Sequence, residues 1–215
     1  MFCQWIRDNQ TSVPNILWSD ECNFSLTGIL NRHNCRIWSQ ENPHAIHTTT
    51  LHSPHICVWM GLSSRFGLKP YFFEGNVNGE NYLDMLREHM IPELKRHRAF
   101  NRTIFMQDGA PPHFSLAVRN FLDAQFPDRV ISRGFATAWP PRSPDLNPLD
   151  YWFWGMLKSK IYHRTTPRSL MHLKELIIET CDNLTVEDFA CAVAQLHRRL
   201  DLLCEANGEN FEQFL

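Results

Sequence analysis

Hydrophobic and polar residues alternate along residues 15–26, the first regular pattern in the chain. Ile16, Trp18 and Phe24 fall on one side of an extended backbone, so the alternation predicts a strand with one buried face. Asp20 shares that face. A carboxylate among large apolar side chains is costly unless a partner or a metal ion neutralises it, and Asp20 is therefore a candidate functional residue.

Two further strand patterns, at residues 55–62 and 68–74, are separated by a short turn and predict a hairpin. After Asn78, a good N-cap, the period changes to three and four, which predicts an amphipathic helix to about Arg98. This helix ends in the basic cluster 95–98. These cations either complement the helix dipole or contact phosphate groups, and the sequence favours neither interpretation.

A second carboxylate follows the short apolar run at residues 104–106. Gly109 and two prolines break regular structure after Asp108, and an apolar pattern of helical period starts at Phe114. The pattern predicts a buried strand, a sharp turn and a helix, and a further short strand is predicted at residues 129–131. A carboxylate at the carboxyl end of a strand in an α/β sheet lies in a crevice where ligands bind. An ordinary turn aspartate fits this stretch alone equally well.

The third carboxylate lies in a proline-rich segment, residues 139–154. Four prolines between positions 140 and 148 hold the chain extended, and Asn147 then caps a helix with Pro148 at its first position. Asp150 follows in the first turn, where the helix dipole favours an anion. The apolar stripe of this helix, which includes Phe153, places Asp150 on or beside the core-facing side.

The two ends of the chain are expected to flank this core. Residues 1–14 predict a residual linker without a complete element of secondary structure. Residues 166–215 predict a C-terminal extension of two amphipathic helices, the first opened by Thr166-Pro167 and the second by Thr185. The apolar stripe on the second helix is most simply explained by core packing, although a partner helix would also fit it.

A long polar stretch at residues 27–54 predicts a loop of a length that is usually functional or disordered. Histidines stand in and just after it, at positions 44, 47, 52 and 55. Structural zinc prefers mixed cysteine and histidine ligands in closer pairs, so solvated loop histidines are the better interpretation than a zinc site.

Composition indicates a soluble globular chain of one domain, or a core with a helical annex, because 43% of its 215 residues are hydrophobic and 20% are charged. The apolar runs are too short to span a bilayer, and the first residues lack the form of a signal peptide. Seven cysteines without a CxxC pair predict reduced thiols in an intracellular compartment. The net charge of −2 does not indicate a nucleic-acid binder, but local basic patches still contact phosphate.

Asp20, Asp108 and Asp150 come from two strands and one helix, which a mixed sheet can bring to a single crevice. Three facing carboxylates repel one another, and their pKa values rise unless a cation lies among them. Mg²⁺ is held by a few carboxylates together with water and phosphate oxygens, and two such ions about 4 Å apart activate a nucleophile and stabilise the leaving oxygen. The three acids therefore predict metal-dependent cleavage or transfer of a phosphodiester.

Three sequence blocks together resemble the catalytic region of Tc1/mariner-family transposases in the DDE/D superfamily: WSDECNF around Asp20, QDGAPPH around Asp108 and SPDLNPLD ending at Asp150. The resemblance covers nearly the whole chain from about residue 15. It implies an α/β fold, a ribonuclease H-like mixed five-stranded sheet flanked by helices in residues 15–165, with a C-terminal helical extension. It also implies that the three aspartates are the catalytic residues and the ligands of two Mg²⁺ or Mn²⁺ ions. Asp145, in the third block, aligns with a structural position.

The same resemblance implies double-stranded DNA as the partner, both transposon ends and target, and a nuclear location. Residues 27–54 resemble the clamp loop through which mariner transposases form a homodimer, with Trp38 at the contact. Full-length family members carry paired helix-turn-helix modules before the catalytic region, and residues 1–14 are too few to hold them. Poor sequence-specific affinity is therefore expected of this chain, because base-edge contacts specify DNA. The candidates for phosphate contact are Arg32, Arg36, Arg133, Arg142, Lys158 and Lys160.

Functions of two different classes are open at this point. The first is an enzyme, a Mg²⁺-dependent DNA transposase or endonuclease. The second is an inactive or host-recruited transposon fragment that binds DNA or dimerises without turnover. The complete set of three acids favours the enzyme. A host ribonuclease H acting on RNA–DNA hybrids would share the chemistry, but the three blocks do not support it.

Overall fold

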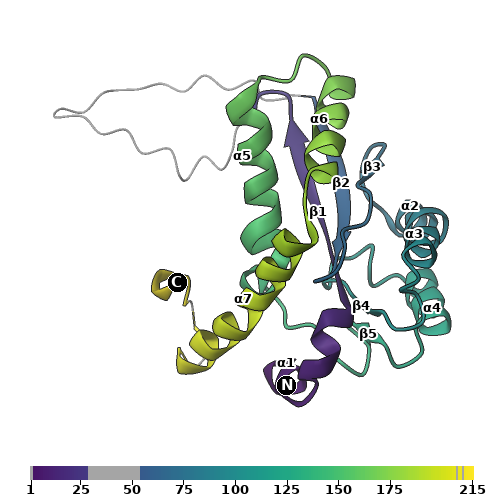
Figure 1. Ribbon diagram of the computed structural model, residues 1–215. Helices are drawn as coiled ribbons and strands as arrows, with labels where there is room; N and C mark the ends of the chain where they lie inside the picture. Colours follow the sequence, from purple (N-terminus) through teal and green to yellow (C-terminus); the bar gives the residue numbers. More distant parts are fainter. Residues whose placement is uncertain (1, 29–53, 207, 210) are drawn as a thin grey trace.

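The computed structural model describes residues 2–28, 54–206, 208–209 and 211–215 (Figure 1). Nearly all of the predicted clamp loop, with Trp38, Arg32 and Arg36, lies outside the described residues, as do the histidines at 44, 47 and 52. Within the described residues, no helix combines the length and the apolar character needed to cross a membrane. The six cysteines in this part of the chain are all free thiols, in agreement with the prediction.

Five strands form one mixed sheet in the order β3-β2-β1-β4-β5. β1 pairs antiparallel with β2, and β2 with β3, whereas β1, β4 and β5 run parallel to one another. The predicted mixed five-stranded sheet is therefore confirmed. The strands are β1 (Ile16–Ser25), β2 (His55–Leu62), β3 (Tyr71–Phe73), β4 (Ile104–Met106) and β5 (Val130–Ile131).

Helices cover both faces of this sheet, as Figure 1 shows. One layer contains α2 (Gly79–Met85), the π-helical turn η3 (Leu86–Met90), α3 (Ile91–Arg96) and α4 (Leu116–Gln125). The other layer contains the π-helical turn η5 (Leu149–Phe153), α5 (Trp154–Arg164), α6 (Leu170–Asp182) and α7 (Val186–Glu205). Shorter elements are α1 (Phe2–Asp8) and the 3₁₀ turns η1 (Gln10–Asn15), η4 (Pro144–Leu146) and η6 (Glu212–Phe214).

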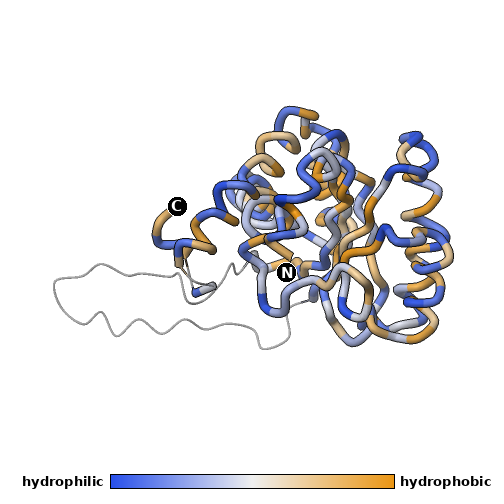
Figure 2. Tube along the Cα trace, turned by 90° about the horizontal axis from the view of Figure 1, so that it is seen from below, coloured by the Kyte–Doolittle hydropathy of each residue, from blue (hydrophilic) through white to orange (hydrophobic). Residues whose placement is uncertain are grey.

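Alternation along β1 divides the hydrophobic core between the two layers, because successive side chains point to opposite faces. Trp18 and Phe24 are buried with α5, α6 and α7, whereas Leu17 is buried with α2, α3 and α4. Figure 2 shows hydrophobic and hydrophilic stretches alternating along the helical turns, as expected for helices that pack on a sheet through one side. Leu173 of α6 and Leu196 of α7 belong to the first core, so the predicted C-terminal extension packs directly on the catalytic sheet.

The expectation that residues 1–14 hold no complete element is wrong. Residues 2–8 form the helix α1, in which Phe2 is 5% exposed and Ile6 is fully buried. The Phe2 ring packs edge-on against Trp139, with 5.0 Å between the ring centroids. Two apolar residues four positions apart make a helical stripe too short to be recognised as periodic, and only the tertiary contacts reveal it.

Replacement of Ile6 by alanine is expected to lower the free energy of unfolding by about 2–3 kcal/mol, the usual cost of truncating a fully buried aliphatic side chain. Chemical denaturation measures the change. Gln4→Ala on the exposed side of the same helix is the matched control, with an expected change within about 0.5 kcal/mol. Equal behaviour of the two variants would show that this segment is the linker that its sequence suggests.

Both C-terminal helices begin at a side-chain cap, but only one begins where it was predicted. α6 starts at Leu170, and the hydroxyl of Ser169 accepts a backbone N–H of its first turn at 3.1 Å. The predicted start at Thr166-Pro167 is therefore too early. Ser169 has an extended backbone and caps the helix, so the helix begins after it. Thr185 caps α7, as predicted.

Candidate active site

The parallel pairing of β1 and β4 brings the first two predicted acids together. Trp18 lies opposite Met106 in this ladder. Asp20 lies two residues beyond Trp18, and Asp108 lies two residues beyond Met106, so both acids follow the last paired residues of this ladder. Because β4 ends at Met106, Asp108 stands where the chain leaves the sheet. The Ser19 hydroxyl donates to the Met106 carbonyl oxygen at 2.7 Å and ties the two strands together at this point.

The third acid, Asp150, comes from the π-helical turn η5. Leu149 and Phe153 of this turn are fully buried, whereas Asp150 is exposed. Asn147 ties the turn to β1, because its side-chain amide donates to the Ser19 carbonyl oxygen at 3.4 Å. The Oδ1 atom of Asn147 also accepts the Leu149 N–H at 3.2 Å. Asp150 therefore lies beside the core-facing stripe, as predicted, and faces a cleft.

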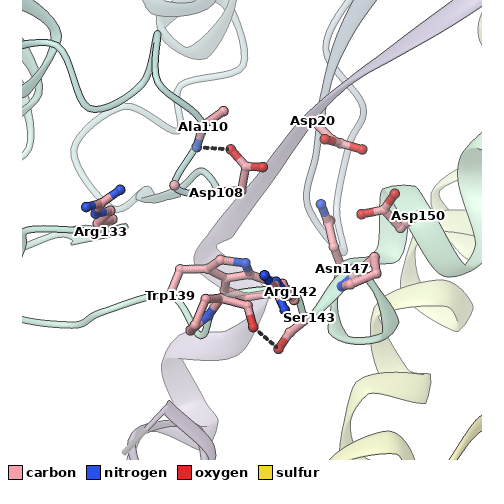
Figure 3. A pocket seen from close by; sticks show the side chains of 12 residues that line it. Asp20, Asp108, Ala110, Arg133, Trp139, Arg142, Ser143, Asn147 and Asp150 are labelled. Atoms are coloured by element: carbon pink, nitrogen blue, oxygen red, sulfur yellow. Dashed lines mark hydrogen bonds between the residues drawn. The ribbon is translucent and has the colours of Figure 1, made fainter. Parts of the chain in front are cut away.

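All three acids line this cleft, which has a volume of about 500 Å³. In Figure 3, Asp20 and Asp150 lie beside each other, and Asp108 lies across from them. Within the described residues, no group of three histidine, cysteine, aspartate or glutamate side chains is arranged to hold one metal ion. The structure therefore places the three predicted acids in one cleft, but their carboxylates do not converge on a single metal position.

The carboxyl groups of Asp20 and Asp150 both have pKa values above the usual range, mainly because both are desolvated. Burial raises the pKa of Asp20 well above its usual value, and the carboxylates of Asp150 and Glu21 raise it further. The Trp154 indole N–H donates to Asp20 Oδ2 at 2.7 Å and partly offsets this rise. Desolvation by the cleft walls raises the pKa of Asp150 to about 6, and the Asp108 carboxylate contributes to that rise. A cation in the cleft would lower the pKa of both groups, because it favours the ionised form.

Asp108 has a different environment, because a buried histidine holds it. His113 is 3% exposed, and its Nδ1 lies 2.6 Å from Asp108 Oδ1 while its Nε2 lies 3.2 Å from Glu21 Oε1. Burial of the ring lowers the pKa of His113, but the two carboxylates outweigh burial and raise it to about 10. His113 is therefore an imidazolium that donates to both acids. Although burial raises the pKa of Asp108, the hydrogen bond from His113 and its charge bring the net value below normal.

Two further residues hold His113 in place. The Tyr82 ring lies 4.3 Å from the His113 ring, centroid to centroid, and its hydroxyl donates to Gln107 Oε1 at 2.9 Å. The Gln107 amide then donates to the His113 carbonyl oxygen at 3.2 Å. His113 and Glu21 were not predicted as site residues, although His113 ends the QDGAPPH block and Glu21 directly follows the first acid.

Two of the four described candidates for phosphate contact line the cleft. Arg133 and Arg142 are exposed there, next to the acids. Lys158 and Lys160 lie on α5 and do not belong to the cleft lining. The Lys158 ammonium instead lies 5.3 Å from the centroid of the Phe24 ring. The structure therefore does not bring these two lysines to the triad.

The mixed five-stranded sheet flanked by helices, with acids on β1, after β4 and on an adjoining helical turn, has the fold of the ribonuclease H-like class. The profile of the family described as DDE superfamily endonuclease matches residues 15–174, and the chain belongs to this family. The Tc3 transposase of Caenorhabditis elegans is 24% identical to this chain over 203 residues, which are 92% of this chain and 58% of that protein.

Solved structures of the Mos1 mariner transposase share the fold. The Mos1 catalytic domain with raltegravir and Mg superposes with a TM-score of 0.74 at 17% identity, covering 98% of this chain and 92% of that one. The Mos1 paired-end complex with the left transposon end gives a TM-score of 0.75 at 19% identity, covering 98% of this chain and 60% of that one. The resemblance to a Tc1/mariner catalytic region is thus confirmed, and the chain spans about three fifths of the full-length relatives.

Proposed function

We propose that this chain is the catalytic domain of a transposase that cleaves DNA phosphodiesters and transfers the strand, with Asp20, Asp108 and Asp150 as metal ligands. The observation that carries the proposal is the convergence of three carboxylates, from β1, the end of β4 and η5, on one cleft. Their separation in sequence leaves no local reason for this convergence. The raised pKa values of Asp20 and Asp150 support the proposal, because a bound cation would favour the ionised form of both groups.

The donor atoms suit a hard divalent cation such as Mg²⁺ or Mn²⁺. Asp108 Oδ1 accepts hydrogen bonds from the Ala110 N–H and from His113, and Asp20 Oδ2 accepts one from Trp154. These carboxylates supply the oxygen ligands that hard cations prefer. Two such ions, when bound, would supply an activated water or 3′-hydroxyl and stabilise the leaving oxygen. The Mos1 structures that share the fold are described with Mg and with Mn.

DNA would approach the acids between Arg133 and Arg142. Both guanidinium groups are exposed at the cleft, where they offset the charge of phosphates next to the scissile bond. The Arg133 guanidinium lies 4.4 Å from the centroid of the Phe114 ring, which orients it. Arg142 has a positive φ of 57°, a conformation that side chains other than glycine rarely adopt and that clusters at functional sites.

The whole protein would act on both transposon ends and on a target duplex, and it would do so in the nucleus. A homodimer through residues 27–54, with Trp38 at the contact and Arg32 and Arg36 near phosphate, completes the proposal. Support comes from the three-block resemblance and from the shared fold with Mos1, whose structures include a paired-end complex with transposon-end DNA. Trp38, Arg32 and Arg36 lie outside the described residues.

Calorimetric titration of Mn²⁺ into the wild-type chain and Asp108→Ala tests the metal site. We expect the wild type to bind Mn²⁺ at least tenfold more tightly than the variant, because a lost carboxylate ligand removes both a donor and a charge. Asp123→Ala, at an exposed acid on α4, is the matched control and is expected to bind like the wild type. Binding by the wild type that is no tighter than by Asp108→Ala contradicts the catalytic assignment. Normal binding without nicking of supercoiled plasmid in Mn²⁺ favours an inactive DNA-binding or dimerisation module instead.

A further inference from the structure

The third acid comes from a helical turn and not from a strand or a strand end. Asp20 lies on β1, and Asp108 follows the end of β4 by two residues. Asp150 instead lies on η5, whose buried residues Leu149 and Phe153 contribute hydrophobic contacts. The buried side chains seat this turn on the core, but a metal ligand has to be held within a narrow range of positions. Directional contacts to η5 and to the neighbouring η4 therefore help to decide where the Asp150 carboxyl lies.

Besides Asn147, helix α7 provides these directional contacts. The hydroxyl of Tyr151, the residue after Asp150, donates to the Ala192 carbonyl oxygen on α7 at 2.7 Å. Arg199, two turns further along α7, donates from Nη1 to the Asp145 carbonyl oxygen in η4 at 3.0 Å. One helix of the C-terminal region thus holds the segment that carries the third acid on both sides of Asn147 and Asp150.

Arg199 also holds Tyr151 directly. Its guanidinium lies 4.0 Å from the centroid of the Tyr151 ring, a close cation–π contact. The Arg199 side chain is 11% exposed, and the Glu212 carboxylate lies 3.8 Å away. Its Nε is buried and has no hydrogen-bond partner among the residues that the structure describes. A largely buried cation with an unsatisfied donor lowers the stability of the folded protein. An apolar residue would fill the same space without that cost, so packing alone does not explain an arginine at position 199.

We propose that Arg199 and Tyr151 are positioning residues that set the Asp150 carboxyl for metal binding, so that α7 is part of the metal site rather than only a cover for the sheet. The inference rests on the proposed metal site at Asp20, Asp108 and Asp150. Residues that orient a metal ligand from outside the coordination shell typically change metal affinity by about 10–100-fold when they are mutated.

The test compares Mn²⁺ affinity with thermal stability in the full chain, with calorimetry carried out well below the melting temperature of every variant. Arg199→Met, which keeps the apolar stem, is expected to weaken Mn²⁺ binding about tenfold. Tyr151→Phe, which loses only the hydroxyl, is expected to weaken it about threefold. The matched control is Val193→Ala, a buried position on the same helix. It is expected to lower the melting temperature without changing the Mn²⁺ affinity.

A double-mutant cycle separates positioning from general loosening. Because Arg199 acts through Asp150, Arg199→Met is expected to have no further effect on Mn²⁺ affinity in an Asp150→Asn background. Unchanged affinity in Arg199→Met, a loss equal to that of Val193→Ala, or a tenfold loss that persists in the Asp150→Asn background would each overturn the inference. Absence of Mn²⁺ binding by the wild type would instead overturn the metal site itself, and the inference with it.

Discussion

Asp150→Asn is expected to lower Mn²⁺-dependent nicking of supercoiled plasmid about a thousandfold while raising the stability of the metal-free protein. The loss corresponds to about 4 kcal/mol of transition-state stabilisation, which is reasonable for removal of a carboxylate that holds catalytic metal ions. The gain in stability follows from the cleft electrostatics, because desolvation and the Asp108 carboxylate disfavour the ionised Asp150 in the folded state, and the Asp150 charge in turn raises the pKa of Asp20. Asparagine keeps the shape of the side chain and removes the charge.

The pH dependence of the stability change provides a second signature. The folded-state pKa of Asp150, about 6, lies above the usual value of 3.8, so ionisation destabilises the folded protein. This destabilisation is complete above pH 6 and disappears below pH 3.8. Asp150 is exposed, so the gain is screened by solvent, and we expect Asp150→Asn to raise the melting temperature at pH 7 by only about 2–4 °C and not at pH 4. A variant that loses activity and melts lower at pH 7 would indicate a structural role for Asp150 instead.

His113→Ala is expected to reduce the free energy of unfolding by about 3 kcal/mol at pH 7, because it leaves the Glu21 and Asp108 carboxylates facing each other without a cation between them. Asp108 is 47% exposed, which keeps the expected cost at the lower end of the range for a broken buried pair. His197→Ala, at an exposed position on α7, is the matched control, with an expected change within about 0.5 kcal/mol. Equal stabilities of the two variants would contradict a charged bridge at His113.

The pH dependence of the free energy of unfolding separates the contribution of the His113 charge from that of its packing. The pKa of His113 is about 10 in the folded state and 6.5 ordinarily, so its contribution to stability is complete below pH 6.5 and is lost as pH rises through 10. Between pH 6.5 and 8.5 the wild type should lose about 2 kcal/mol relative to His113→Gln, which keeps a hydrogen-bonding side chain but carries no charge. Urea unfolding at both pH values measures the difference. Parallel pH profiles of the two proteins would show that the histidine is neutral.

The central fold was predictable because its signals are local. Alternation along β1 and the apolar run of β4 depend only on side chains that face a sheet, and both strands lie where the sequence predicts them. Asp20 was recognised as an acid on a buried strand face and Asp108 as an acid after a buried strand, where an ordinary turn aspartate fitted equally well until the three sequence blocks linked both to Asp150. The structure then places all three in the same cleft.

The features that the sequence did not predict depend on contacts between distant segments. The partnership of His113 with Glu21 spans 92 positions, and nothing in either local pattern indicates it. The burial of Ile6 in α1 and the contact of Arg199 with the loop around Asp145 are equally remote in sequence. In each case an ordinary helix or turn residue gains its role from a tertiary neighbour, which periodicity does not report.

The π-helical turn at Leu149–Phe153 has a practical consequence for building chimaeras with related enzymes. This turn closes with a hydrogen bond from the Trp154 N–H to the Leu149 carbonyl oxygen, so it contains one residue more than an α-helical turn. A donor segment that replaced Leu149–Phe153 by an ordinary α-helical turn would place the residues ahead of it about 100° out of register with α5, since each residue of an α-helix advances the chain by that angle. Leu149 would then turn away from the core, and a splice that keeps the whole π-helical turn together with α5 would avoid that misalignment.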